Sequence, residues 1–263
     1  MSDQGNMILL DSNDPKMYEA SKSAQKEFKY FWREVSWERR RIVPALELAC
    51  VKVAFRTDQP KGEAPELEHM WVGDIDFDGE VISGTLLNAP NWISGLNEAD
   101  SVTANIADVG DWMFVIQGKV YGAFTVNLMR SRMSPEERQN HDAAWGFDFG
   151  DAFNILLEHK PVNKSAFGTS GAGETIESPE HPMSLNMGDS LAEQLKSSSE
   201  LLTYLDEKGW SILHQEALAG NSTSVKVLLD HGADKTLKTQ TGETPLDLAK
   251  KLNWDHVVAV LES

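Results

Sequence analysis

The chain has a single cysteine, Cys50, and no run of apolar residues long enough to cross a membrane. One cysteine cannot form an internal disulfide, which fits a reducing compartment. Cys50 lies in the apolar stretch LELACVKVAF, which favours a buried thiol over a nucleophile. The N-terminal residues also lack the basic and apolar regions of a signal peptide. We therefore expect a soluble, cytoplasmic protein that contacts no membrane.

Basic side chains are scarce: 24 lysines and arginines stand against 41 aspartates and glutamates, giving a formal net charge of -17. This charge is repelled by phosphate backbones, so nucleic acid is not an expected partner. Between Lys61 and Lys119 there is no lysine or arginine, although acidic residues continue throughout. A long stretch of one sign predicts a basic protein partner, with simple solubility as the alternative interpretation.

The sequence also lacks the residue groupings that catalysis and metal binding require. The seven histidines are scattered, and the glycine-rich FGTSGAGET has neither a Gly-Lys-Ser/Thr ending nor a preceding strand. His141-Asp142 could act as an acid–base pair, but local capping is favoured. We expect no enzymatic activity, no cofactor and no metal. An enzyme with a site near Trp112 or His141 is the open alternative.

Several segments have clear helix or strand signals. Asp14-Pro15, followed by apolar residues at helical spacing, begins a predicted helix, and Ser134-Pro135 begins another. The three arginines Arg39–Arg41 suit the end of the first helix better than an RNA-binding patch. The predicted helices span 15–37 and 134–145, and the predicted strands 46–55, 101–106, 112–116 and 120–129. Residues 1–159 are therefore expected to form an α+β domain, an antiparallel sheet with flanking helices.

The segment DIDFDGE, residues 74–80, has two interpretations. Alternating carboxylates followed by glycine begin a calcium loop, but the twelfth position of that loop is Thr85 instead of a bidentate glutamate. Asp78-Gly79 is also the sequence of a two-residue type I′ turn. Pairing outward from this turn places Phe77 opposite Glu80 and gathers apolar side chains on one face. A β-hairpin is therefore favoured over a calcium site.

The last third of the chain contains a repeat. After a Pro-, Gly- and Ser-rich stretch over 160–188, which predicts a linker, Gly209 and Gly242 are 33 residues apart. The segments GWSILHQEALAGNSTSVKVLLDHGADKTLK and TGETPLDLAKKLNWDHVVAVLES resemble ankyrin repeats. The resemblance implies an all-α ankyrin module over 189–263, in which 189–205 forms a degenerate cap before two repeats.

Ankyrin modules bind proteins through their fingers and inner helices. In this sequence the resemblance implies partner-binding residues in the fingers: Trp210, Lys238, Thr239, Gln240 and Thr241. His214 lies in the turn that opens the first repeat, where a local hydrogen-bonding role is expected. Glu216 stands where the family has a small alanine, so its carboxylate should either face solvent or be paired.

Residues 68–151 contain EHMWVGDIDFDGEVISGTLLNAP, DWMFVIQGKVYGAFTVNLMR and HDAAWGFDFGD. These segments resemble the bacterial YegJ-like family, domain of unknown function 2314, over most of residues 30–151. Members of this family also occur joined to ankyrin repeats, and no activity is established for it. Some such proteins occur near toxin genes, which by analogy implies an immunity protein.

Together these features predict a non-catalytic protein that binds another protein. The most specific interpretation is an immunity protein that neutralises a basic bacterial toxin through an acidic face. An ankyrin adaptor in another pathway and an unrecognised enzyme are the alternatives. The acidic residues expected on the binding face are Asp74, Asp76, Glu80, Asp108 and Asp111.

Overall fold

The computed structural model of the protein describes residues 14–58, 65–159, 179–198 and 200–263. The chain divides into two compact units. The first consists of Met1–Phe31 and Val43–His159, and the second of Trp32–Ile42 and Lys160–Ser263. This division differs from the expected domains 1–159 and 189–263, because Trp32–Ile42 belongs with the C-terminal part of the chain.

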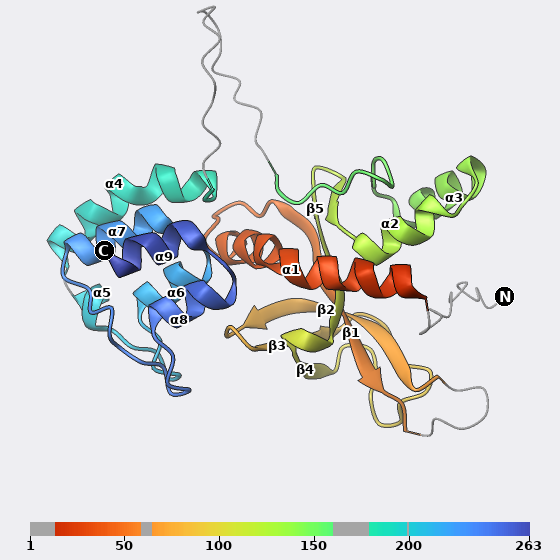
Figure 1. Ribbon diagram of the computed structural model, residues 1–263, viewed down its shortest axis with the longest axis horizontal. Helices are drawn as coiled ribbons and strands as arrows, with labels where there is room; N and C mark the ends of the chain where they lie inside the picture. The colour runs from red at the N-terminus through yellow and green to blue at the C-terminus, as the bar shows by residue number, and fades with distance from the viewer. Residues whose placement is uncertain (1–13, 59–64, 160–178, 199) are drawn as a thin grey trace, which may run out of the picture. The chain divides into compact units, whose positions relative to one another are not determined.

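The first unit is built on a six-stranded antiparallel sheet with the strand order β4-β3-β2-β1-β5-β6 (Figure 1). Helices pack on both faces of this sheet, so the expected α+β class is confirmed. A short 3-10 helix, η1 (Ile106–Asp108), connects β4 to β5. The strands are β1 (Leu46–Arg56), β2 (Leu67–Phe77), β3 (Val81–Leu86), β4 (Ser101–Asn105), β5 (Val109–Ile116) and β6 (Lys119–Gly122).

Helix α1 (Pro15–Glu38) covers one face of the sheet and agrees with the predicted helix over 15–37. Its residues Ala24 and Phe28 are fully buried. The indole nitrogen of Trp112 in β5 donates a hydrogen bond of 2.8 Å to the Ala24 carbonyl, and the Phe28 ring packs edge-on against Phe77 in β2. Burying a large apolar side chain contributes about 1.5–3 kcal/mol, so this aromatic layer fixes α1 on the sheet.

Helices α2 (Phe124–Ser131) and α3 (Pro135–Trp145) lie at the β5 end of the sheet, away from β3 and β4 (Figure 1). The predicted cap of α3 is confirmed, because Ser134 and Glu137 form a reciprocal capping box. Beneath these helices a buried cluster joins Cys50 and Met113 of the strands to Val126 of α2. Cys50 is thus a core residue, as predicted, and burial raises the pKa of its thiol.

The β2–β3 hairpin forms where the sequence predicted it, but the predicted register is wrong. Phe77 lies opposite Ile82 instead of Glu80, and Asp78 and Val81 close a wider turn through a backbone hydrogen bond of 3.2 Å. The Asp78 carboxylate accepts hydrogen bonds from the amides of Glu80 and Val81 at 3.0 and 2.7 Å, which stabilises this turn.

A bulge in β2 accounts for the rest of the register difference. The pairing with β3 is irregular between Gly73 and Asp76, and Asp74 adopts a left-handed conformation with φ of +50°. Ordinary alternation would put Val72 and Phe77 on opposite faces, because they are five positions apart, which is an odd number. The extra residue at the bulge lets both side chains be buried and leaves Asp74 exposed.

The predicted strand over 120–129 is correct only up to Gly122, because the following residues form α2. Gly122 and Ala123 have φ angles of +76° and +58°, which turn the chain out of the sheet. The carboxylate of Asp111 then accepts hydrogen bonds from the amides of Phe124 and Thr125 at 2.9 and 2.8 Å. A helix N-terminus capped by a distant carboxylate overrides the β propensity of this segment.

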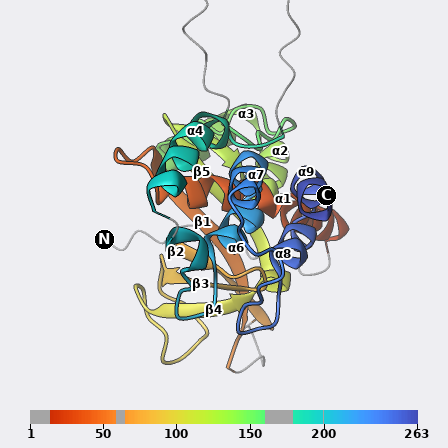
Figure 2. The same cartoon turned by 90° about the vertical axis from the view of Figure 1, so that its left-hand side faces the viewer.

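The second unit contains two helix pairs with the expected 33-residue spacing: α6 and α8 begin at residues 212 and 245, and α7 and α9 begin at residues 222 and 255. Figure 2 shows α6 and α7 between α4 on one side and the α8–α9 pair on the other. Helix α4 begins inside the stretch 160–188 predicted as a linker, of which 160–178 lies outside the described residues. The helices are α4 (Pro182–Ser197), α5 (Glu200–Thr203), α6 (Ile212–Leu218), α7 (Ser222–Asp230), α8 (Pro245–Lys251) and α9 (Asp255–Glu262).

The C-terminal end of α1 is part of the second unit's core. Trp37 is buried, its indole nitrogen donates a hydrogen bond of 3.0 Å to Asn221, and its ring stacks on His181. Beside it, Arg40 forms an ion pair of 2.8 Å with Glu216, whose carboxylate also accepts a hydrogen bond of 2.8 Å from Asn221. Glu216 is therefore buried and paired, which was one of its two predicted states.

A second ion pair fixes the same segment. The buried carboxylate of Glu34 lies 2.7 Å from Arg41 and 3.4 Å from His181, and Arg41 also pairs with Glu38. Burial alone would raise the pKa of Glu34, but the hydrogen bonds and charges of His181 and Arg41 hold it below its ordinary value. Arg40 and Arg41 are thus both engaged in ion pairs within the protein.

We predict that Arg40 and Glu216 are energetically coupled. In a double-mutant cycle of Arg40→Ala and Glu216→Ala, urea denaturation should give a coupling energy of about 1–3 kcal/mol, because either single change leaves a largely buried charge without its partner. Arg40→Ala paired with Glu38→Ala is the matched control, since Glu38 contacts Arg41 instead. Additive effects of the Arg40 and Glu216 changes would contradict the prediction.

Candidate partner-binding site

The loops that open the two repeats are held against each other in the second unit. The Gln240 amide donates a hydrogen bond of 3.0 Å to the Lys208 carbonyl, and the Gln240 side chain donates one of 2.6 Å to the Glu207 carbonyl. The side chains of Lys238, Gln240 and Thr241 are exposed. Their assignment to a partner surface stays a prediction, and the structure gives them the exposure that this role needs.

Trp210 and Thr239 were also predicted to contact a partner, but both are buried. Trp210 is 8% exposed and packs against the ring of His214, and the Thr239 hydroxyl bonds that of Thr241 at 2.8 Å. The prediction of a direct contact is therefore wrong for these two residues. Both side chains pack inside the loops that open the repeats and stabilise these loops.

Tyr204 and Leu205 directly precede the first finger and were not predicted from the sequence. Their exposed fractions are 64% and 42%. An exposed tyrosine beside a rigid loop is typical of a protein-binding surface, since tyrosine buries a large area at low entropic cost. The available sequence signal was an aromatic and a leucine immediately before the turn residues Asp206 and Gly209.

His214 has the local role that the sequence predicted. Its Nδ1 accepts a hydrogen bond of 3.1 Å from the Ser211 amide, and its Nε2 lies 3.1 and 3.2 Å from the carbonyls of Leu237 and Glu243. A ring that accepts at Nδ1 and donates at Nε2 is neutral. Burial lowers the pKa of His214, against the opposing effect of the Glu243 and Leu237 carbonyls.

Of the five acidic residues predicted to contact a partner, four lie at or near the surface of the first unit and the fifth, Asp111, is buried. Asp74, Glu80 and Asp108 are exposed, and Asp76 is half-buried. The Ile106 amide donates a hydrogen bond of 2.9 Å to the Glu80 carbonyl, which brings the β2–β3 turn beside η1 and its residue Asp108. Asp74 lies farther along β2, at the bulge. These four carboxylates are named the acidic surface below.

Asp111 does not belong to the acidic surface, and its prediction as a binding residue is wrong. It is 0% exposed, because strand alternation places it on the sheet face that α2 covers. Besides capping α2, its carboxylate accepts a hydrogen bond of 2.5 Å from the Thr125 hydroxyl. The buried amine of Lys52, directly across the strand pair, donates to the same hydroxyl at 2.8 Å and lies over the Trp71 ring.

Three further carboxylates in the stretch without lysine or arginine also have structural roles. Glu68 is buried and accepts hydrogen bonds from the amides of Asn91 and Trp92 at 2.7 and 3.0 Å. Asp100 accepts one of 2.7 Å from Asn97, and Asp78 stabilises the hairpin turn. Part of the charge in this stretch therefore also shapes the loops of the first unit.

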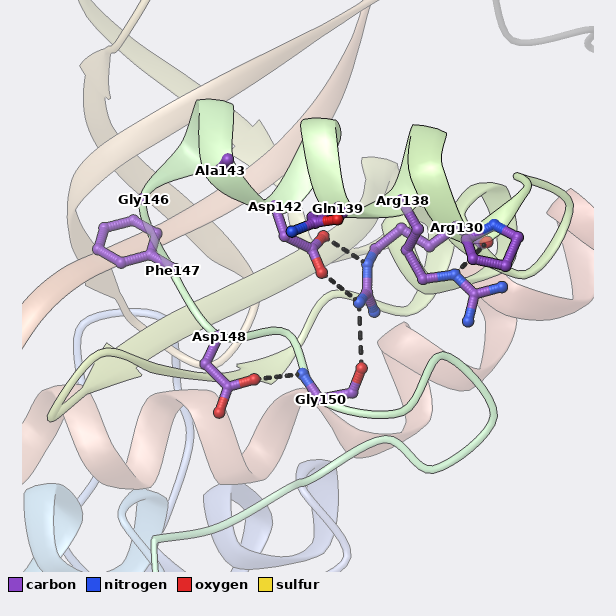
Figure 3. Close-up of a pocket in the computed structure, with 10 residues that line it drawn as sticks. Arg130, Arg138, Gln139, Asp142, Ala143, Gly146, Phe147, Asp148 and Gly150 are labelled. Carbon is purple, nitrogen blue, oxygen red and sulfur yellow. Dashed lines mark hydrogen bonds and ion pairs between the residues drawn. The ribbon is translucent and has the colours of Figure 1, made fainter.

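A pocket of about 580 Å³ lies between α2, α3 and the chain that follows them (Figure 3). Arg130 in its wall is buried and holds both oxygens of Asp142, at 2.8 and 2.6 Å, together with the Gly150 carbonyl at 3.0 Å. His141 lies 2.9 Å from the same Asp142 carboxylate. Asp142 thus binds Arg130, and His141 bonds Asp142, so the pair has a structural role in fixing the Arg130 side chain.

The lining of this pocket lacks the usual hydroxyl and thiol nucleophiles. Its lining residues include no serine, threonine or cysteine that Asp142 could activate. Trp112, near which an enzyme site was the open alternative, is fully buried. Within the described ranges no group of three or more His, Cys, Asp or Glu could hold a metal ion, and no helix is long and apolar enough to span a membrane.

Comparison with known proteins relates both parts of the chain to others. Residues 14–149 match the family model described as "Uncharacterized protein conserved in bacteria (DUF2314)". The chain is 43% identical over 256 residues to the putative ankyrin repeat protein NMB1133/NMB1171 of Neisseria meningitidis serogroup B, covering 97% of this chain and 96% of that protein. The chain therefore belongs to the DUF2314 family, joined here to C-terminal ankyrin repeats.

Two further relatives match one part each. The uncharacterized protein YegJ of Escherichia coli is 23% identical over 83 residues, which covers 32% of this chain and 54% of YegJ. The ankyrin repeat-containing protein P1E11.10 of Schizosaccharomyces pombe is 37% identical over 51 residues, which covers 19% of this chain and 25% of that protein.

We predict that Asp111 affects stability and that Asp108 does not. Asp111→Ala should lower the free energy of unfolding by about 3–5 kcal/mol, because it removes the cap of α2 and leaves the Lys52 charge buried without a carboxylate. Asp108→Ala, the control three residues away, removes an exposed side chain and should change it by less than about 0.5 kcal/mol. Urea denaturation followed by circular dichroism measures both, and equal effects would refute the assignment.

We also predict that the second unit loses stability as the pH falls below about 6.5. The folded-state pKa of His214 lies below its ordinary value of 6.5, so the unfolded chain binds a proton more readily and protonation favours unfolding. The effect of Glu34 has the same sign but appears only below its ordinary pKa of 4.5. Thermal unfolding between pH 7.5 and 5.5 should show a falling melting temperature, with a weaker fall in His214→Gln. An identical pH dependence in both proteins would contradict the prediction.

Proposed function

We propose that this protein binds another protein without catalysing a reaction, and that the fingers of its ankyrin repeats make the primary contact. The main support is that the two loops that open the repeats are joined by Gln240. Its backbone amide bonds the Lys208 carbonyl, and its side chain bonds the Glu207 carbonyl. The exposed residues of these loops, named the finger surface below, are Tyr204, Leu205, Lys238, Gln240 and Thr241.

Rigidity supports this role. Hydrogen bonds from His214 to the carbonyls of Leu237 and Glu243 anchor the second loop, and the buried Trp210 anchors the first. A loop already held in one conformation loses little entropy when a partner binds, which raises affinity. The relatives named for ankyrin repeats agree with a protein-interaction role.

We further propose that the partner is basic and that the acidic surface of the first unit makes a second contact with it. The four carboxylates of this surface lie on β2, the β2–β3 turn and η1, within residues 62–118, which contain no lysine or arginine. Such a surface attracts a basic protein and raises its association rate. A basic toxin such as a nuclease is one partner of this kind, and the protein would then act as an immunity protein whose carboxylates imitate substrate phosphates.

The absence of catalysis is likewise a proposal, supported by how the buried polar groups are used. Arg130 is held by Asp142 and by backbone carbonyls, Lys52 by Thr125, and His214 by three backbone groups. The hydrogen bonds of these side chains are made within the fold, which supports a structural role for them.

We predict that charge reversal on the acidic surface weakens partner binding by about ten-fold at low salt. The double variant Asp74→Lys/Asp76→Lys is compared with Glu19→Lys/Glu136→Lys, which changes the net charge equally at exposed positions outside the acidic surface. The immobilised proteins are exposed to a lysate of the source bacterium, and retained proteins are identified and quantified by mass spectrometry. Equal loss in both variants would refute a role for the acidic surface.

A third variant, Tyr204→Ala/Gln240→Ala, separates the two surfaces. If the finger surface makes the primary contact, this variant should retain at least about ten-fold less of the same partner, because an interface aromatic is lost. Retention equal to that of the unchanged protein would contradict the finger proposal. An acidic or neutral partner would contradict the proposal of a basic toxin and leave protein binding intact.

A further inference from the structure

The two edges of the sheet differ in whether another segment of the chain forms hydrogen bonds with them. At one edge, β6 is covered by the segment that follows α3: the Val120 amide donates to the Asp148 carbonyl at 2.9 Å, and the Gly122 amide donates to the Leu156 carbonyl at 2.7 Å. At the other edge the strand order ends with β4. Within the part of the chain that the structure describes, no segment pairs with the outer side of β4.

The hydrogen bonds that flank β4 show which backbone groups point outward. The Ile106 amide donates to the Glu80 carbonyl at 2.9 Å, and the Leu86 amide donates to the Asp100 carbonyl at 3.0 Å. Hydrogen-bonded pairs alternate along an antiparallel ladder, so residues 100, 102, 104 and 106 face β3. The amides and carbonyls of the three residues between them therefore point away from the sheet: Ser101, Thr103 and Asn105.

This edge has few of the devices that normally prevent pairing with another chain. The sequence SVTAN contains no lysine and no proline, and its register with β3 runs without a bulge from Ser101 opposite Thr85 to Asn105 opposite Val81. Ser101 and Thr103 are exposed. Helices α2 and α3 lie at the other end of the sheet (Figure 1), so they do not cover the edge.

Charge determines which strand could pair there. Glu80 and Asp108 lie at one end of β4, and Glu98 and Asp100 lie just before the other end. An acidic segment, or a second copy of this chain with its net charge of -17, would be repelled by them. An extended segment with basic side chains is complementary to both ends.

We propose that β4 is a docking edge, to which an extended basic segment of the partner protein adds as a seventh strand. Backbone hydrogen bonds to Ser101, Thr103 and Asn105 would provide affinity, and the flanking carboxylates would select a basic sequence. This inference rests on the proposed binding of a basic protein and adds the mode of contact.

The test uses a change that blocks the outer side of β4 without touching its bonds to β3. Thr103→Pro removes the outward amide, and proline is tolerated on edge strands where that group faces solvent. Thr103→Ala removes the same side chain and keeps the amide, so it is the matched control. The probe is an end-blocked octapeptide of alternating lysine and valine, with an alternating glutamate and valine peptide as its charge-reversed counterpart.

Hydrogen exchange measured by NMR on the full-length protein should show fast exchange at the amides of Ser101, Thr103 and Asn105. The lysine peptide should slow these three amides, whereas the glutamate peptide should not. Thr103→Pro should weaken lysine-peptide binding by about ten-fold, and Thr103→Ala by less than about two-fold. A lysine peptide N-methylated at every residue, which has no backbone donor on either edge, should also fail to slow them and needs no change in the protein.

Three results would overturn the proposal: slow exchange at these amides before any peptide is added, no response to the lysine peptide, or equal binding by Thr103→Pro and the unchanged protein. Protection that increases with protein concentration alone would assign the edge to a second copy of the chain and equally reject a basic partner. If a basic partner is captured but Thr103→Pro retains it fully, this inference fails and the proposed function stands. If no protein is captured while the lysine peptide protects the edge, the proposed function fails instead.

Discussion

The second unit depends on a segment from far away in the sequence, the end of α1. Two ankyrin repeats bury too little apolar surface to be stable by themselves. Trp32, Val35 and Trp37 add buried apolar area, and Arg40 neutralises the carboxylate that Glu216 places where the ankyrin family has alanine. The presence of each residue accounts for the other, because an unpaired charge of either sign would destabilise the fold at this largely buried position. Since α1 also packs on the sheet of the first unit, one helix contributes to two hydrophobic cores.

The contact between the end of α1 and the second unit lies away from the finger surface. Residues of α1 reach Asn221, in the turn between α6 and α7, whereas the fingers lie at the opposite end of those helices, where α6 begins after Ser211. A partner bound at the finger surface would therefore not compete with the end of α1. In the first unit, likewise, Asp111 and Glu68 serve the fold, while three of the four carboxylates of the acidic surface are exposed and Asp76 is half-buried.

Local signals predicted much of this fold, and long-range contacts account for what they missed. The N-cap at Asp14 and the capping box at Ser134 identified α1 and α3 because caps depend on neighbouring residues only. The hairpin register and α2 were mispredicted because a bulge at Asp74 and a cap from Asp111 are set by other strands. The exposure of a carboxylate likewise depends on tertiary structure, so a charge count could not separate Asp111 from Asp108. The docking of α1 had two signals in the sequence, the glutamate at 216 and the arginines after α1, but neither identified the other as its partner.

The central claim is that residues 32–38 of α1 belong to the folding unit of the ankyrin repeats. Native-state hydrogen exchange on the full chain tests it most directly when Leu228→Ala, a fully buried core change in α7, lowers the stability of the second unit by about 2–5 kcal/mol. The account predicts that the opening free energy of the amides of residues 35–38 falls together with that of α6–α9, while the amides of residues 20–31 keep theirs. Amides 35–38 that keep their opening free energy while those of α6–α9 lose it would contradict the account.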